Sequence, residues 1–213
     1  MVKIKICGLR RAADIEAANA LLPDYVGFVF AQSRRKVIPK EAAVLRQTLD
    51  GSIGAVGVFV NAEITDVAKT AALCKLCAVQ LHGDEDGGFI QALRPMLPEG
   101  CEIWKAARIS IADDLRAALT LDADRLLFDA FSPDARGGTG QRFDWSLLKS
   151  ADIRQPFFVA GGITPDNAAE AVAAASGTNG FCGLDVSGGV ETDGYKDYDK
   201  MKRLIDAVRM QEV

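Results

Sequence analysis

Short runs of apolar residues, several of them alternating with polar ones, recur along the chain and predict β-strands. In the first run, residues 3–7 (KIKIC), the two isoleucines point to one face, whereas Lys3, Lys5 and Cys7 point to the other. Gly8 then marks the turn that ends this strand. Seven further runs have the length and composition of strands: residues 24–30, 53–60, 77–81, 102–106, 125–129, 157–160 and 180–186.

The segments between these runs carry apolar residues at helical spacing. In the first segment, Ala12, Ile15 and Ala18 lie on one helical face. Pro39 suits the first turn of the second helix, and Asp144 is a candidate cap for a short helix that follows a glycine-rich loop over residues 130–140. The predicted helices cover residues 11–22, a stretch opened by residue 39, and residues 62–73, 86–97, 112–119, 144–148, 165–174 and 198–209.

This order of elements predicts an α/β fold. Eight strands that alternate with eight helices, without a linker or a low-complexity segment, are typical of a (β/α)₈ TIM barrel. We therefore expect one compact catalytic domain over residues 1–213. The alternative, an open flavodoxin-like or Rossmann sheet, usually has five or six strand–helix units and, for dinucleotides, an early GxGxxG motif; Gly8 is followed by no such glycines.

Composition and charge exclude several classes of protein. The chain has 213 residues, 49% of them hydrophobic and 25% charged, with a formal charge of −4. This balance fits a globular protein and argues against a general binder of nucleic acid or anionic membranes, which would need a basic face. No apolar run approaches the ~18 residues of a membrane span, and a strand occupies the position of a signal peptide's apolar region. We expect a cytoplasmic protein.

The chain contains five cysteines, and this odd number argues for reduced thiols rather than a disulfide framework. Cys74 and Cys77 form a CxxC pair, but the pair ends a predicted helix instead of opening one, so we interpret both as structural thiols. For Cys7 the pattern alone leaves two interpretations open. It is either a buried structural cysteine or a reactive thiol held at the end of a strand.

The phase of the strands favours the second interpretation. The apolar faces of the fourth, sixth and eighth strands are formed by Cys77, Val79 and Leu81, by Leu126 and Phe128, and by Cys182, Leu184 and Val186. The opposite face of the eighth strand then carries Phe181, Gly183 and Asp185. Cys7, His82, Asp129 and Asp185 all end strands on this second face. Barrel enzymes carry their chemistry at the C-terminal strand ends, so four such residues in phase predict a site.

Two glycine-rich segments follow the last two strands and predict a phosphate site. Gly161 and Gly162 precede a predicted helix start at Pro165, and Ser187, Gly188 and Gly189 follow the eighth strand. Exposed backbone N–H groups and helix N-termini bind anions, and barrels commonly hold phosphate at the loops after strands seven and eight.

With these residues assembled, the chain resembles the phosphoribosylanthranilate isomerase family of tryptophan biosynthesis. The matching segments occur in order along nearly the whole chain: KICGL within residues 3–9, GVFVN at 57–61, VQLHG at 79–83, FDA at 128–130, GGTG at 137–140, AGGI at 160–163 and DVSGGVE at 185–191. The combination is far more specific than any single segment.

The resemblance implies an Amadori rearrangement of N-(5-phosphoribosyl)anthranilate by general acid–base catalysis, with no metal and no cofactor. By analogy Asp129 is the general acid and Cys7 the general base, while Arg35 meets the anthranilate carboxylate. His82 and Asp185 match pocket residues near the substrate, and Gly137, Gly138, Thr139 and Gly140 match a loop near it. An unperturbed thiol has a pKa of about 8.5, so Lys5 on the same strand face is expected to favour the thiolate.

Two positions depart from the usual family pattern. Gly188 replaces the second serine of DVSSGVE, which removes a hydroxyl donor to phosphate but keeps the backbone N–H. Arg34 replaces the usual proline, so Arg34 and Arg35 compete for the carboxylate role; the register favours Arg35.

Several other functions fit the sequence less well or remain open. A metal-dependent pentulose-phosphate epimerase would need two histidines, and the chain has only His82. A thiol hydrolase that pairs Cys7 with His82 would leave the glycine loops and Asp129 without a role. A non-catalytic phosphosugar-binding barrel, activity on a histidine-pathway aminoaldose, and a monomeric or homodimeric state all remain open. The expected partner is a phosphorylated small molecule, with neither nucleic acid nor membrane.

Overall fold

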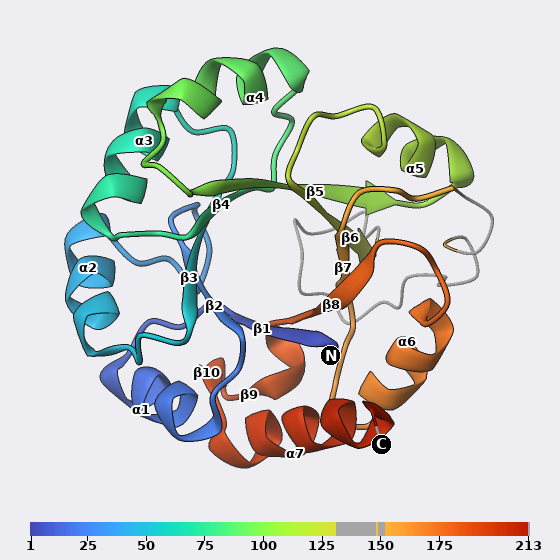
Figure 1. Cartoon of the computed structure of the whole chain (residues 1–213). Coiled ribbons are helices and arrows are strands. Elements are labelled where there is room, and N and C mark those ends of the chain that lie inside the picture. The colour runs from blue at the N-terminus through green and yellow to red at the C-terminus, as the bar shows by residue number, and fades with distance from the viewer. Residues whose placement is uncertain (131–147, 149–151, 213) are drawn as a thin grey trace.

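The computed structural model of the chain describes residues 1–130, 148 and 152–212. Eight parallel strands form a closed barrel in the order β1 to β8, and helices cover its outside (Figure 1). The strands are β1 (Lys3–Cys7), β2 (Tyr25–Val29), β3 (Gly54–Phe59), β4 (Ala78–Leu81), β5 (Glu102–Ile109), β6 (Arg125–Ala130), β7 (Phe157–Val159) and β8 (Phe181–Val186). The predicted (β/α)₈ barrel is therefore confirmed.

Five helices follow the first five strands, and two more follow the last two strands. They are α1 (Ala12–Leu21), α2 (Pro39–Thr48), α3 (Ile64–Leu73), α4 (Gly87–Leu93), α5 (Ala112–Ala118), α6 (Ala168–Ala175) and α7 (Tyr198–Arg209). Pro39 occupies the first turn of α2 as predicted. The predicted loop over residues 130–140 and the predicted helix over 144–148 lie outside the described residues, apart from Ala130, which ends β6, and Leu148.

Three predicted boundaries were wrong by three residues or more. Helix α6 begins at Ala168 instead of Pro165, because Pro165 lies in a turn whose ends are joined by the Asn167 side chain. The predicted helix over residues 86–97 ends as an α-helix at Leu93, and residues Arg94–Met96 continue as a 3₁₀ helix around Pro95. Strand β5 is three residues longer than the predicted 102–106, since Ala107 to Ile109 continue to pair with β6.

The barrel has two separate apolar cores. The larger one lies between the strands and the helices and includes Ile4, Ile6 and Val79. The smaller one fills the barrel interior, where Trp104 stacks on Phe158 at a centroid distance of 5.0 Å. Tyr25 packs edge-on against the same indole, also at 5.0 Å. Alternation along each strand thus separates an outer apolar face from an inner one.

Two cysteines face the opposite way from the prediction. The pairing of β7 with β8 shifts register, so that Phe157 pairs with Phe181 and Phe158 pairs with Gly183, which leaves Cys182 as an extra residue. As a result Phe181 packs against the outer core and Cys182 against the inner one, while Gly183 and Asp185 keep the predicted phase. Cys77 precedes β4 and also packs against the inner core. The sequence pattern does not reveal such an irregularity.

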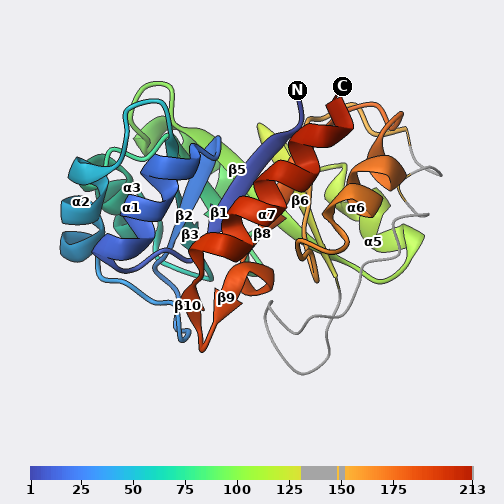
Figure 2. The same cartoon turned by 90° about the horizontal axis from the view of Figure 1, so that it is seen from below.

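A small hairpin at the C-terminal end of the barrel was not predicted. It consists of β9 (Glu191–Thr192) and β10 (Tyr195–Lys196), and it is preceded by a 3₁₀ helix over Gly188–Val190. Seen from the side, it lies at the opposite end of the molecule from both chain termini (Figure 2).

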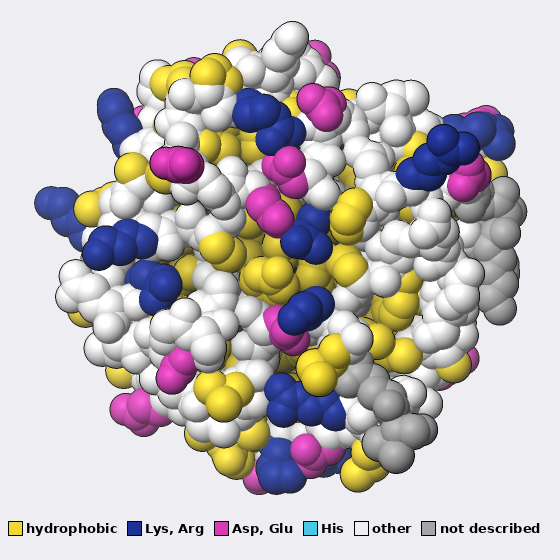
Figure 3. Space-filling model, viewed as in Figure 1, with side chains coloured by type: hydrophobic (Ala, Val, Ile, Leu, Met, Phe, Trp, Pro, Cys, Tyr) yellow, Lys and Arg dark blue, Asp and Glu magenta, His cyan; other side chains and the backbone are white. Residues whose placement is uncertain are grey.

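The face that carries the termini has apolar side chains at its centre and charged side chains around them (Figure 3). Within the described part of the chain, no helix is both long and apolar enough to cross a membrane.

Candidate active site

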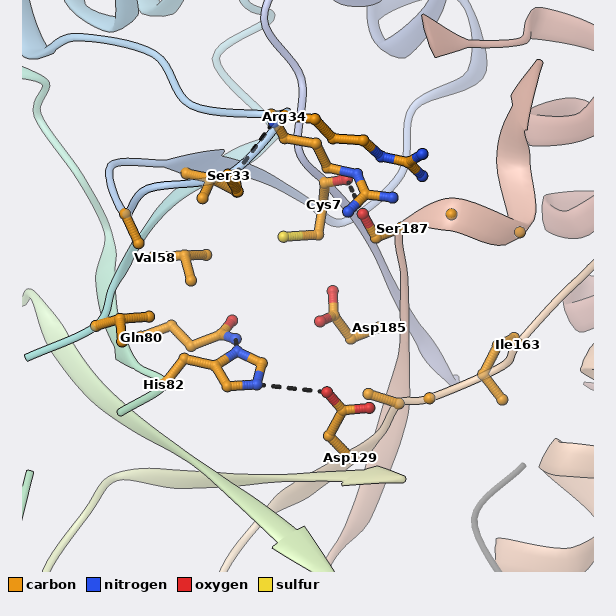
Figure 4. Close-up of a pocket in the computed structure, with 18 of the residues that line it drawn as sticks. Cys7, Ser33, Arg34, Val58, Gln80, His82, Asp129, Ile163, Asp185 and Ser187 are labelled. Carbon is orange, nitrogen blue, oxygen red and sulfur yellow. Dashed lines mark hydrogen bonds and ion pairs between the residues drawn. The ribbon is translucent and has the colours of Figure 1, made fainter. Parts of the chain in front are cut away.

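A cavity of about 590 Å³ opens at the C-terminal ends of the strands, a size suited to a small-molecule ligand. Its walls come from the strand ends and the loops that follow them, and Figure 4 shows the polar side chains that point into it. The residues predicted for the site that line it are Cys7, Arg34, Arg35, His82, Asp129, Gly161, Gly162, Asp185, Ser187, Gly188 and Gly189. Residues 137–140, predicted to lie near the substrate, are outside the described residues.

Cys7 is the last residue of β1 and lies against Gly27 of the neighbouring β2. A Cβ atom at Gly27 would stand 2.7 Å from the Cys7 sulfur, so the thiol occupies space that only glycine leaves free. The Gly27 carbonyl also accepts hydrogen bonds from the N–H groups of Gly8 and Leu9, at 2.8 and 3.0 Å. The thiol and the turn that follows it are therefore both held by one residue of β2.

Charged groups surround the buried thiol. Lys5, with no exposed side-chain surface, donates a hydrogen bond to Asp185 over 2.8 Å. Burial raises the pKa of the Cys7 thiol, and the positive charge of Lys5 offsets part of that rise, as does that of Lys196 to a smaller extent. Burial alone would lower the pKa of Lys5, but Asp185 and Cys7 raise it above its ordinary value, so Lys5 stays protonated.

Gln80, His82 and Asp129 form a row along one wall of the cavity (Figure 4). The Gln80 amide nitrogen lies 3.1 Å from His82 Nδ1, and His82 Nε2 lies 3.3 Å from Asp129 Oδ2. If the amide nitrogen donates to Nδ1, the neutral imidazole carries its proton on Nε2, which faces Asp129. Neither His82 Nε2 nor Gln80 Oε1 makes a hydrogen bond within the described residues, and the charged group that His82 Nε2 faces is the Asp129 carboxylate.

The two arginines of the β2–α2 loop differ in how firmly they are held. The Arg35 side chain is 12% exposed, and its Nε and Nη2 donate to Glu191 over 2.6 and 2.9 Å. The Arg34 side chain is 61% exposed and makes one such bond, from Nη2, over 2.9 Å. The aliphatic part of Arg35 passes over Gly8, where an added Cβ would lie 2.5 Å from Arg35 Cδ.

The two predicted phosphate loops lie next to each other at the cavity wall. Gly161 and Gly162 adopt positive φ angles of 81° and 67°. The other loop packs so closely against this one that a Cβ at Gly189 would overlap the Ile163 carbonyl. No backbone acceptor among the described residues is bonded to the N–H groups of Gly161, Gly162, Gly188 or Gly189, which leaves these donors for an anion. The nearest helix, α6, starts farther along than predicted.

The sequence prediction missed four residues of this neighbourhood. Gln80 was placed on the inner face but was given no role, although it shares that face with His82 two residues later. Gly27, Glu191 and Lys196 do not end a predicted strand, and Glu191 enters the sequence prediction only as the last residue of the DVSGGVE segment. Among the described residues, no group of three or more histidines, cysteines or acidic residues is arranged to hold a metal ion.

The chain matches one protein family over almost its whole length. The sequence model of the family described as "N-(5'phosphoribosyl)anthranilate (PRA) isomerase" matches residues 4–207. The chain belongs to the PRA isomerase family.

Several similar proteins and solved structures are PRA isomerases. The chain is 43% identical over 209 residues to the N-(5'-phosphoribosyl)anthranilate isomerase of Thermoanaerobacter sp. (strain X514), covering 98% of each sequence. It is 44% identical over 211 residues to that of Clostridium acetobutylicum, again with 98% coverage of each. The crystal structure of the PRA isomerase from Thermotoga maritima matches with a TM-score of 0.86 and 31% identity, over 99% of this chain and 100% of that one.

A second solved PRA isomerase is a complex with reduced 1-(o-carboxyphenylamino)-1-deoxyribulose 5-phosphate. It matches with a TM-score of 0.83 and 30% identity over 99% of this chain and 100% of that one. The resemblance predicted from the sequence segments is thus confirmed at the level of the family.

Proposed function

We propose that this chain isomerises N-(5'-phosphoribosyl)anthranilate to 1-(2-carboxyphenylamino)-1-deoxy-D-ribulose 5-phosphate, a step of tryptophan biosynthesis. The observation that carries the proposal is that a buried thiol, a carboxylate and two open glycine loops line one cavity at the C-terminal end of a barrel. Membership of the PRA isomerase family names the substrate that suits this arrangement.

Asp129 acts first, as the general acid. It transfers a proton to the ring oxygen of the ribose while the bond between that oxygen and C1' breaks, and a Schiff base forms between C1' and the anthranilate nitrogen. His82, 3.3 Å from Asp129 Oδ2, lies beside this proton and orients the carboxyl group. A positioned acid or base typically contributes 10²–10⁴-fold to the rate.

Cys7 then acts as the general base. The positively charged Schiff base makes the C2' proton acidic, and the thiolate removes it to give an enolamine that tautomerises to the ketone. Lys5 favours the thiolate through its charge. The reaction rearranges the atoms of one substrate, so nothing is oxidised or reduced overall.

The remaining groups bind the two ends of the substrate. The N–H groups of the glycine loops receive the phosphate, and Arg35 receives the anthranilate carboxylate. Arg35 suits this role better than Arg34 because its side chain is the more buried and the more firmly held. No contact joins Cys7 to His82 among the described residues, which disfavours the thiol-hydrolase alternative.

A steady-state assay of the purified protein tests the proposal. We expect turnover of freshly prepared phosphoribosylanthranilate, undiminished by a chelator, and the histidine-pathway aminoaldose is assayed in parallel. Absence of turnover above background with phosphoribosylanthranilate would favour a non-catalytic binding barrel. Turnover of the aminoaldose alone would assign the protein to the histidine pathway instead.

The compartment and the oligomeric state belong to the same proposal. We place the reaction in the cytoplasm, where its phosphorylated substrate would be made. A monomer and a homodimer both fit a barrel whose described site residues come from one chain, and sedimentation of the purified protein distinguishes them.

A further inference from the structure

Glu191 lies just behind the arginines of the cavity mouth, although neither the family resemblance nor the proposed mechanism gives it a role. Its side chain is only 4% exposed. It accepts hydrogen bonds from Arg35, from Arg34 over 2.9 Å, and from Lys196 over 2.8 Å. Three positive side chains therefore meet on one carboxylate, and the cluster keeps a net positive charge that suits an anionic substrate.

The bonds to Glu191 determine which edge of Arg35 is free. A guanidinium group has five N–H donors in a rigid plane. Glu191 takes the edge formed by Nε and Nη2, at 2.6 and 2.9 Å. Two of the three remaining N–H groups, one on Nη1 and one on Nη2, form a second edge that can bind another carboxylate with two parallel hydrogen bonds.

The position of Glu191 is itself fixed from several sides. Lys200 donates to the Glu191 carbonyl over 2.7 Å, and Lys196 donates to the carbonyl of Ser187 over 2.9 Å. The hairpin that carries Glu191 is also held through Tyr195, which makes cation–π contacts with two arginines. The centroid of its ring lies 4.5 Å from the guanidinium carbon of Arg10 and 4.1 Å from that of Arg11.

Glu191 stays ionised over the working pH range. Burial by itself would raise its pKa, but the hydrogen bonds from Arg35 and Lys196, together with their charges, lower it to about 2. A group that is always negative and almost fully enclosed can hold Arg35 without competing for the protons of the reaction.

From this geometry we propose that Glu191 is a positioning residue, which orients Arg35 so that its free edge meets the carboxylate of the substrate. The proposal rests on the proposed function, since it assumes a substrate with a carboxylate at that end. It assigns Glu191 to recognition of the anthranilate half and not to binding of the phosphate.

The test compares Glu191→Gln with the unaltered protein, using two probes of binding. One probe is reduced 1-(o-carboxyphenylamino)-1-deoxyribulose 5-phosphate, which carries both anions, and the other is inorganic phosphate. Loss of an oriented, charge-assisted contact is expected to weaken the first probe by about tenfold or more. Binding of inorganic phosphate should stay within about twofold, the scatter expected for a group without a direct contact. In the steady-state assay, KM should rise more than kcat falls.

Glu102→Gln is the matched control. Glu102 also holds an arginine by two bonds, from Arg125 over 2.7 and 3.0 Å, but it does not line the cavity. The Glu102→Gln variant should leave the affinities for both probes unchanged. The double variant Glu191→Gln, Arg35→Ala should bind the first probe no more weakly than Arg35→Ala alone, because a residue that acts through Arg35 has no effect once Arg35 is removed.

Three results would overturn the proposal. They are unchanged affinity of a folded Glu191→Gln protein for the first probe, equal weakening of both probes, and full additivity in the double variant. Failure of the unaltered protein to turn over phosphoribosylanthranilate would instead count against the proposed function, and the binding comparison would still decide the role of Glu191.

Discussion

Cys7 is surrounded by groups whose effects on its ionisation oppose one another. Burial disfavours the thiolate, Lys5 and Lys196 favour it, and Asp185 disfavours it again. Because Lys5 is paired with Asp185, its charge is kept in place beside the sulfur. The reactivity of the thiol therefore depends on the buried ion pair of Lys5 and Asp185 beside it.

At the two proposed catalytic residues, removal of the acid or the base should lower kcat with little effect on binding. Cys7→Ser and Asp129→Asn are each expected to lower kcat by at least ~10²-fold. Both are close to isosteric, so the affinity for the reduced product analogue should change little. Steady-state kinetics and titration with that analogue measure the two effects. Near-full activity of Cys7→Ser would show that another group is the base.

A second prediction concerns pH. Since Lys5 lowers the pKa of Cys7, Lys5→Met should raise it, and the rising limb of kcat/KM against pH should move to higher pH. A pH–rate profile of both proteins measures the shift. Lys105→Met is the matched control, because Lys105 is a buried lysine paired with Glu85 and does not line the cavity. If the rising limb of the Lys5→Met protein stayed at the same pH, that limb would report the ionisation of a group other than Cys7.

At the scale of elements, each wall of the site depends on a neighbouring strand or hairpin. Gly27 of β2 makes room for the thiol of β1, and Gly8 makes room for Arg35 of the loop after β2. The hairpin β9–β10 holds Glu191 and Lys196 behind the arginines. The site is therefore assembled from contacts between elements that are far apart in the sequence.

Gly27→Ala should impair catalysis more than folding. The added methyl group would lie 2.7 Å from the Cys7 sulfur, so the thiol must move. We expect a loss of kcat of at least about tenfold and a destabilisation of roughly 1–3 kcal/mol, typical of overpacking. Kinetics and chemical denaturation measure both. Gly51→Ala, where an added Cβ meets nothing within 4 Å, should change neither quantity. Full activity of Gly27→Ala would mean that the sulfur position is not critical.

The start of α7 offers a test of stability. Asp197 accepts from the Lys200 N–H over 3.1 Å and from Thr192 in the hairpin over 2.7 Å, and these bonds lower its pKa. Asp197→Ala should lower the free energy of unfolding by about 1 kcal/mol, which is typical of the loss of a helix cap. A carboxyl group whose pKa is lower in the folded protein stabilises the fold at pH values above its unfolded-state pKa. The difference in free energy of unfolding between the two proteins should therefore shrink as the pH falls through the pKa of Asp197 in the folded protein. Denaturation at neutral and acid pH checks this; equal differences would contradict it.

For the whole molecule, the order of strands and helices was readable from the sequence because each strand of a barrel has a regular inner and outer face. The phase of His82, Asp129 and Asp185 followed from the same regularity and brought them to one cavity with Cys7. What the pattern does not contain is local irregularity. The register shift at Cys182 and the turn at Pro165 depend on contacts with other elements.

The missed residues have the same explanation. Gly27 is important because it contacts Cys7, which lies about 20 positions away in the chain. Glu191 is important because it binds Arg35, 156 positions away. A sequence pattern records spacing along one element, whereas these roles arise when distant elements meet. Gln80 is different, since its position on β4, two residues before His82, was enough to suggest a shared wall.

The inner core also has a kinetic consequence. Trp104, Phe158 and their apolar neighbours fill the barrel below the cavity, so a ligand has no route out through the terminus-bearing end. Substrate must enter, and product must leave, by the same opening. Substrate and product therefore occupy the same cavity, and we expect the product to inhibit competitively against phosphoribosylanthranilate, with an unchanged limiting rate at saturating substrate. Initial rates at several fixed product concentrations measure this, and a non-competitive pattern would show that the product also binds at another site or to another form of the enzyme.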